Sequence, residues 1–435
     1  MEAAQGGRRQ RRVTKRASTK KLRTPRGWRD NWVLPPLRSP AENIWVDVDE
    51  EPMEIQSRGH ISARLVPKQP AEQLLPTLED LPMLSNTTLQ NAVYAGIDYH
   101  KKTISVTFGD RDGNILEQPT IQNHRQLVEP FFEQFQKLEC VVESCRGYEW
   151  LVDVLREQGH TVHVGHSRAI KLIAKSNCKT DKIDSRILMQ LLAKSFLPTT
   201  YIPTADERKY RELLRHRSSL VRTATRSKLR IHAILAKENI HIRFPFSTRG
   251  RMQLQQLCDE LKLPAHRQRI LEQELSVLDF AEERADEQMS QITRHSRKEP
   301  GVLLLRTIPG FNTLMAMAYI GEVGDVSRFK KGDQVAAYLG LVPRVYSSGS
   351  TARCGRITKT GSPFMRWMLV QAAWSAIKGS PNLRFRFASI AKRRGQKVAI
   401  VAIARKLAII AFKVLREKTE YKEEMLDAGL ARAAF

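Results

Sequence analysis

Apolar and polar positions form a regular pattern from residue 93 to about residue 135. The apolar runs Val93–Asp98, Ile104–Phe108 and Ile115–Ile121 are short and rich in β-formers, which predicts three strands. Between the second and the third, Asp110–Asn114 reads DRDGN, a sequence typical of a hairpin turn. Arg125–Phe135 then places its apolar residues on one helical face, so we predict a helix there.

Four further elements continue this pattern to about residue 200. We predict a buried strand at Cys140–Val142 that ends at Glu143, and a helix at Gly147–Gln158. A fifth strand at Thr161–Val164 and a helix at Lys182–Ser195 follow. The resulting order, βββαβαβα, is that of the ribonuclease H architecture, an α/β fold.

Two long helical patterns dominate the next segment. Arg208–Ile240 and His266–Arg294 both carry apolar residues at heptad-like spacing. A basic stripe on the first helix consists of Arg211, Arg215, Arg222 and Arg226. The two helices predict an antiparallel arm that either carries a dimer contact or only packs within the chain. Arg243–Arg251, between them, is predicted to be a loop or a mobile segment.

The C-terminal part predicts a mainly helical domain. Leu303–Gly324 gives two helices around a tight Pro309–Gly310 turn, a hairpin that either presents backbone N–H groups to a phosphate or is only structural. Ser362–Pro363 marks a further helix start, with Ser as the cap. Val398–Phe412 predicts a buried, Ala-rich helix that is too short to span a bilayer.

These elements predict an α/β domain followed by all-α parts. We expect a basic, disordered extension at residues 1–90, the α/β domain at 91–200, a helical coiled-coil arm at 201–298, a mainly helical domain at 299–425 and a tail at 426–435. The basic arm Arg8–Arg29 either grips nucleic acid or results from cloning or start-site choice.

The net charge of +26 points to a polyanionic partner, most simply nucleic acid. The charge is uneven: residues 208–237 hold ten Lys and Arg against one acid, and residues 341–416 hold sixteen against none. The five cysteines contain no C-x-x-C pair, which argues against zinc and a disulfide framework and fits a reducing cytoplasm. An apolar run of the kind found in secretory signals does not follow the basic N-terminus.

Four carboxylates stand where such an α/β domain would bring them together. They are Asp98, Glu143, Asp181 and Asp184. The last two are three residues apart, which puts them on one face of a helical turn. Oxygen ligands suit hard divalent cations, and two such ions can clamp the attacking and leaving oxygens of a phosphodiester. Taken alone, an Asp at a strand end is more often a turn or cap residue.

A turn-rich loop at Gly340–Thr360 contains Ser347 and Ser348. Such a loop is usually only a flexible turn, but this one is surrounded by cations, namely Arg344, Arg353, Arg356, Lys359 and Arg366. Guanidinium groups hold phosphates bidentately and offset developing charge, which is what a nucleophilic serine needs. We therefore expect these five residues, with Arg215, Arg222 and Arg226, to bind nucleic acid.

The chain resembles a known family in both halves. GIDYHKK, VVESCRGYEWL and KTDKIDSRIL are similar to the acidic motifs of DEDD insertion-sequence transposases, which act as bridge-RNA-guided recombinases. TIPGFNTLMAMAYIGEVGD, continued by LGLVPRVYSSGSTARCGRITKTGSPFMRWMLVQAA, is similar to their C-terminal transposase domain. The resemblance covers about Val93 to Leu415 and extends to a family of pilin-gene-type DNA invertases of similar build.

The resemblance implies a RuvC-like domain in which Asp98, Glu143, Asp181 and Asp184 bind Mg²⁺ or Mn²⁺. It makes Ser348 the nucleophile that forms a phosphoserine intermediate with DNA, with Ser347 beside it as the alternative. It also implies target and donor DNA and a non-coding bridge RNA as partners, a dimer that assembles to a tetramer, and a nucleoid-associated place in the bacterial cytoplasm without a membrane. The long N-terminal extension departs from the family pattern.

Two other functions fit part of the same sequence. The first is a RuvC-like, structure-specific nuclease that cuts with metal-activated water and makes no use of the serine. The second is a non-catalytic nucleic-acid-binding protein.

Overall fold

The computed structural model describes residues 77–173, 180–260, 262–348 and 351–426, and for residues 347, 348 and 351–354 only the backbone. Most of the predicted extension and of the tail therefore lies outside the described residues. The last part of that extension is folded: a 3-10 helix at Leu78–Asp80 precedes α1 (Asn86–Asn91). Leu81, Leu84 and Leu89 pack against the core of the α/β domain, so the folded part begins before the predicted boundary at residue 91.

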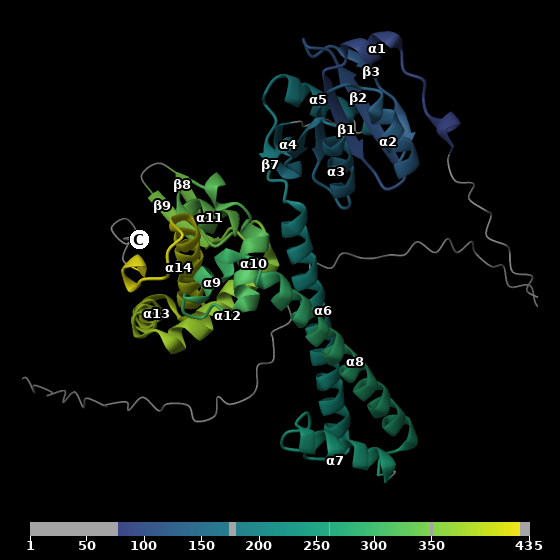
Figure 1. Cartoon of the computed structure of the whole chain (residues 1–435). Helices are drawn as coiled ribbons and strands as arrows, with labels where there is room; N and C mark the ends of the chain where they lie inside the picture. Colours follow the sequence, from purple (N-terminus) through teal and green to yellow (C-terminus); the bar gives the residue numbers. More distant parts are fainter. Residues whose placement is uncertain (1–76, 174–179, 261, 349–350, 427–435) are drawn as a thin grey trace, which may run out of the picture. The chain divides into compact units, whose positions relative to one another are not determined.

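Seven strands form one mixed sheet within the described residues (Figure 1). In chain order they are β1 (Tyr94–Tyr99), β2 (Thr103–Gly109), β3 (Ile115–Glu117), β4 (Thr120–Gln122), β5 (Glu139–Glu143), β6 (Thr161–Gly165) and β7 (Thr199–Thr200). The order across the sheet is β3-β2-β1-β5-β6-β7, and β4 also pairs with β2. β1 is antiparallel to β2 but parallel to β5, which is in turn parallel to β6.

The third predicted strand is split into β3 and β4. Both pieces pair with β2, and a register shift at Phe108 and Gly109 accompanies the break. Pro119 lies in the gap, where a residue without an N–H group interrupts a ladder least. The short β7 was not predicted.

Helices cover both faces of the sheet. α2 (Arg125–Glu133) and α3 (Glu149–Glu157) bury their apolar faces against the side of β1 and β5 that carries Ile97 and Val142. α5 (Asp181–Ala193) packs on the opposite side, where Leu188 and Leu192 meet Val141. α4 (Ser167–Ile173), which was not predicted, contributes Ile170 to this second layer. The alternation of side chains along each strand therefore separates two cores.

The arm consists of α6 (Ala205–Lys237), α7 (Thr248–Asp259) and α8 (Ala265–Ser296). The predicted heptad seam is buried within the chain: Ile231 and Leu235 of α6 share a core with Leu271 and Leu278 of α8. Much of the predicted loop at Arg243–Arg251 precedes or enters α7, a helix that sequence reasoning missed because its apolar positions are few.

The C-terminal part is mainly helical, as predicted. Its helices are α9 (Pro300–Arg306), α10 (Thr313–Val323), α11 (Gly332–Tyr338), α12 (Pro363–Gly379), α13 (Pro381–Arg394) and α14 (Gln396–Glu417), followed by a 3-10 helix at Glu423–Leu426. α14 contains the predicted Ala-rich stretch, and its buried residues join the core of this part. Among the described residues, the helices all fall short of the length and apolarity that crossing a membrane requires.

The predicted loop at Gly340–Thr360 is instead largely a hairpin of β8 (Pro343–Ser348) and β9 (Thr351–Ile357). Gly340 and Gly361 close its base with positive φ angles of 68° and 72°. A β-carbon on Gly340 would lie 2.2 Å from the Thr360 carbonyl oxygen. The two ends of the hairpin can therefore approach each other this closely only with glycine at residue 340. Turn-forming residues concealed the strands because glycine, proline and serine are as frequent as the β-formers in this stretch.

Candidate functional site

Asp98 and Glu143 lie at the same edge of the sheet. β1 and β5 run parallel and pair up to Ile97 and Val142, and the two acids follow directly in each strand. Gly96, two residues before Asp98, faces α5, as does Val141, two residues before Glu143. Because side chains alternate along a strand, Asp98 and Glu143 belong to the α5 face as well.

α5 brings the other two acids to this edge. The Thr180 side chain accepts a hydrogen bond of 3.3 Å from the Ile183 N–H, so the helix starts at Asp181 and carries Asp181 and Asp184 in its first turn. Ser185, one residue further, forms a buried hydroxyl–hydroxyl hydrogen bond of 2.8 Å with Thr107 of β2. This bond and the contact at Gly96 fix the start of the helix against the sheet.

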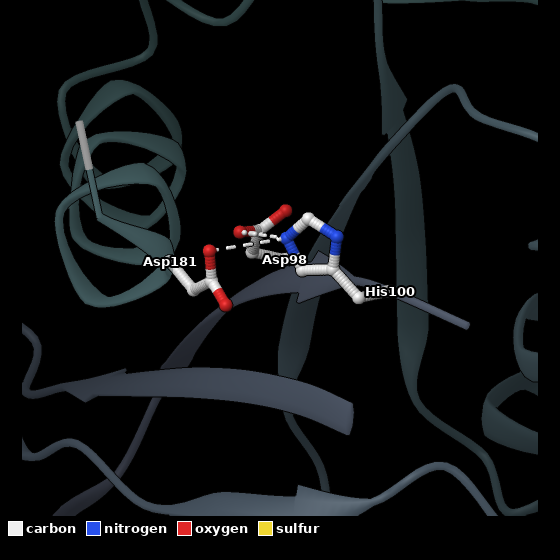
Figure 2. A group of neighbouring side chains, drawn as sticks. All are labelled: Asp98, His100 and Asp181. Atoms are coloured by element: carbon white, nitrogen blue, oxygen red, sulfur yellow. Dashed lines mark hydrogen bonds and ion pairs between the residues drawn. The ribbon is translucent and has the colours of Figure 1, made fainter. Parts of the chain in front are cut away.

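A histidine joins the carboxylates. The His100 Nε2 atom lies 3.0 Å from Oδ2 of Asp98 and 3.3 Å from Oδ1 of Asp181, and Figure 2 shows the imidazole edge facing both groups. One donor atom from each of the three residues lies within 4.8 Å of the others. Sequence reasoning missed His100, although its place two residues after Asp98 in GIDYHKK was a usable signal.

The electrostatics of the site follow from burial and from like charges. Asp98 is only 5% exposed. Burial raises the pKa of its carboxyl to about 6, the nearby His100 opposes this rise, and the charges of Asp184 and Asp181 add to it. The pKa of the Cys145 thiol is likewise raised to about 11 by burial and by the charges of Glu143 and Asp98. Asp98 therefore interacts electrostatically with Asp181 and Asp184, and Glu143 lies close enough to the Cys145 thiol, as Asp98 does, to raise its pKa. Glu143 and Asp184 are outside the compact group of three, which consists of Asp98, His100 and Asp181.

This donor set fits a divalent metal ion. A buried carboxyl beside two further carboxylates is costly to ionise unless a cation compensates it. Oxygen donors from Asp and Glu are those that Mg²⁺ and Mn²⁺ prefer, and a two-metal site needs several of them. Asp98, Asp181, Asp184 and Glu143 are the residues that could hold such ions.

The serine region is described only in part. The backbone of Ser348 ends β8 and pairs with Thr351 across the hairpin. The side chains of Ser347, Ser348 and Arg353 lie outside the described residues. Arg344 of β8, Arg356 of β9 and Lys359 are exposed, and Lys359 adopts a left-handed φ of 58°.

Two predicted nucleic-acid ligands already have protein partners. Nη1 of Arg366 donates to the carbonyl oxygens of Leu339, Thr360 and Gly361 at 3.3, 2.7 and 3.1 Å. Nη2 of Arg215 donates at 2.6 Å to Oε1 of Glu322, a carboxylate that is 4% exposed.

The other two predicted arm contacts differ from these. Arg222 donates a 3.3 Å hydrogen bond to Ser218, on its own helix, and Arg226 is exposed. Both guanidinium groups therefore remain on the surface of α6, where a phosphate could reach them.

Two family models match the chain, in the order of its two halves. A model of DEDD transposases of the IS110 type matches residues 95–240, from β1 to just beyond α6. A model described as the transposase IS116/IS110/IS902 family matches residues 302–387, from α9 into α13.

Relatives of known name match along most of their length. A probable family 20 transposase of Pseudomonas aeruginosa is 27% identical over 333 residues, which cover 75% of this chain and 98% of the relative. The transposase for insertion sequence element IS1328 of Yersinia enterocolitica is 25% identical over 342 residues, 77% of this chain and 100% of the relative. A pilin gene-inverting protein of Moraxella bovis is 24% identical over 352 residues, 76% of this chain and 98% of the relative.

Proposed function

Because this chain belongs to the DEDD transposases of the IS110 type, we propose that it is the transposase of a bacterial insertion sequence, which cuts and rejoins DNA in the cytoplasm. The observation that carries the proposal is the convergence of Asp98 and Asp181 at one sheet edge, with Glu143 and Asp184 beside them. Carboxylate oxygens supplied by separated segments are the ligands that hard divalent ions use.

The acids would hold Mg²⁺ or Mn²⁺. When bound, such ions polarise the scissile phosphate and stabilise the attacking and leaving oxygens of the displacement. Asp98, fixed on a strand, and Asp181, fixed at a helix start, orient the phosphate between two rigid elements. Precise orientation of this kind supplies a large part of the rate of phosphoryl transfer.

Ser348 would supply the nucleophile. Its Oγ attacks the DNA phosphorus, a new Oγ–P bond forms, and one backbone P–O bond breaks to leave a DNA hydroxyl. The phosphoserine link retains the energy of the phosphodiester, so a second DNA hydroxyl can reverse the step and join a new partner. Arg344 and Arg356, both exposed on the same hairpin, support this role because guanidinium groups offset the charge of the phosphorane-like transition state.

The choice of DNA site would come from a bridge RNA that pairs with target and donor DNA. The resemblance to guided recombinases supports this part of the proposal, whereas the charge of +26 supports a polyanionic partner of either kind, DNA or RNA. Base pairing would read sequence, while the protein contacts backbones, as in other guided enzymes.

Subunits would pair through the arm as a dimer that assembles to a tetramer. Ile270, Val277 and Phe280 of α8 are exposed apolar residues, two of them seven apart, and a second helix could cover them.

The test is trapping of the covalent intermediate. The protein is purified with its nucleic acid, the RNA is sequenced, and a nicked suicide substrate is built from the element end. We expect a DNA–protein adduct on a denaturing gel, mapped by mass spectrometry to Ser348. Ser348→Ala should lose the adduct, Ser347→Ala should keep it, and Asp98→Asn should lose both adduct and cleavage.

A RuvC-like nuclease is the second candidate, because the described acids alone suffice for attack by water. It predicts that Ser348→Ala cuts DNA as well as the natural chain. A non-catalytic binding protein predicts instead that Asp98→Asn changes neither cleavage nor exchange.

A further inference from the structure

We propose that His100 is a direct ligand of the divalent ion in this site, which makes the centre one of mixed nitrogen and oxygen donors. This deepens the metal-dependent function proposed above and presupposes it. The chemistry concerns one atom, Nε2 of His100, and its two neighbours, Oδ2 of Asp98 and Oδ1 of Asp181.

The separations of these atoms match those of neighbouring ligands on one ion. With bonds of 2.0–2.1 Å, adjacent ligands of a six-coordinate ion are about 3.0 Å apart. The distances from Nε2 to the two carboxylate oxygens are 3.0 and 3.3 Å. The nitrogen therefore already lies at the spacing of neighbouring ligands on one ion from each of the two oxygens (Figure 2).

The backbone holds His100 in place before any ion arrives. Its N–H donates to the Thr103 carbonyl at 3.0 Å, which closes the turn between β1 and β2. The Asn123 side chain donates to the His100 carbonyl at 2.6 Å, and the Asn123 N–H donates to the Lys102 carbonyl at 2.8 Å. Because the turn is already anchored, His100 loses little conformational entropy when its imidazole binds an ion.

The competing role for His100 is that of a hydrogen-bond partner to Asp98. Both roles use Nε2, and they cannot be filled at once, because a ligating nitrogen carries no proton. A neutral imidazole with its proton on Nδ1 presents the Nε2 lone pair to the space shared by Asp98 and Asp181. The His100 side chain is 50% exposed, so water can be the hydrogen-bond partner of Nδ1–H, which is usual for a metal-bound histidine.

A nitrogen ligand changes which ion the site prefers. Mg²⁺ favours oxygen donors, whereas imidazole binds better to ions later in the first transition row, with Mn²⁺ between the two. His100 should therefore raise the affinity for Mn²⁺ more than that for Mg²⁺.

The experiment uses Mn²⁺ alone with the full chain. Electron spin echo spectra of bound Mn²⁺ detect a directly bound ¹⁴N nucleus. We expect this modulation in the natural protein and in His241→Ala, an exposed histidine of the arm that serves as the control. We expect it to vanish in His100→Ala while Mn²⁺ still binds, with the preference for Mn²⁺ over Mg²⁺ falling on the order of tenfold.

The outcomes separate the inference from the function that it presupposes. If Mn²⁺ binds to the natural protein and Asp98→Asn abolishes binding, but ¹⁴N modulation is absent, His100 is only a hydrogen-bond partner and the acid site stands. Modulation that persists in His100→Ala overturns the inference in the same way. If Mn²⁺ does not bind at all, the metal site itself is wrong, and the inference is wrong with it.

Discussion

Gly96 of β1 lies directly beneath Ser185 of α5, so that a β-carbon on the glycine would come within 2.1 Å of the Ser185 carbonyl oxygen. The same β-carbon would lie 2.4 Å from the backbone nitrogen of Met189. These are backbone atoms of a helix and cannot swing aside as a flexible side chain would. The backbones of α5 and β1 are therefore as close as two backbones can be. This close approach holds the first turn of α5 beside Asp98.

We expect Gly96→Ala to displace α5 and to weaken metal binding. The added methyl group forces the start of the helix away from the sheet, which separates Asp181 and Asp184 from Asp98. Overpacking of this kind costs about 1–3 kcal/mol of stability. Isothermal titration with Mn²⁺ should show a lower affinity, and thermal unfolding should show the loss of stability.

The control for this prediction is Gly379→Ala. Gly379 ends α12, and a β-carbon there would meet no heavy atom within 4 Å. The control should bind Mn²⁺ as the natural chain does. Equal affinities for Gly96→Ala and Gly379→Ala would show that the close approach does not set the metal site.

His160 should make the stability of the α/β domain depend on pH. Its Nδ1 accepts the Leu138 N–H at 3.1 Å, and burial lowers its pKa below the usual 6.5. Between the two pKa values the unfolded chain binds more protons than the folded one, so the free energy of unfolding falls as the pH drops through about 6.5. In His160→Asn, whose side-chain oxygen can still accept from Leu138, chemical denaturation between pH 8 and pH 5.5 should show a weaker dependence. An unchanged slope would assign the effect to another group.

We expect Arg215 to be a structural residue and Arg222 to be a DNA-binding residue. Arg215→Ala removes the 2.6 Å partner of the buried Glu322 carboxylate, so it should cost about 1–3 kcal/mol in urea denaturation and leave the salt dependence of DNA binding unchanged. Arg222→Ala should leave stability intact and reduce the slope of log K against log salt by about 0.9. The reverse pattern would restore Arg215 as a phosphate contact.

The sequence predicted those parts of the fold that have strong periodicity. The strands around Asp98 and Glu143 and the long helices of the arm came from apolar spacing alone, and the start of α12 came from Ser362, whose side chain accepts the Met365 N–H at 3.2 Å. The positions of Asp98, Glu143 and the Asp181–Asp184 pair at one edge followed from the order of elements.

The remaining features depend on contacts between distant segments, which periodicity does not record. The β8–β9 hairpin is stabilised at its base by Gly340 and Gly361, both of which look like loop residues in the sequence. The place of His100 depends on Asn123, which is 23 residues away along the chain. Glu322, the partner of Arg215, is 107 residues away along the chain. The sequence therefore did not reveal this ion pair, and the positive charge of Arg215 was read as a DNA contact.

Arg366 should be required for the hairpin itself. Its Nη1 donates to three carbonyl oxygens at the hairpin base, and its pKa is lowered by burial, so Arg366→Met leaves those carbonyls without a donor while keeping an apolar stem. Loss of such partners costs about 1–3 kcal/mol. The Thr358 amide, which closes the base by donating to Val342 at 2.9 Å, should exchange its hydrogen about tenfold faster for each 1.4 kcal/mol lost. Arg356→Met, on the exposed face of β9, should leave this hydrogen exchange unchanged. If both variants accelerated the exchange equally, positive charge on the hairpin, rather than the hydrogen bonds of Arg366, would be what stabilises the hairpin.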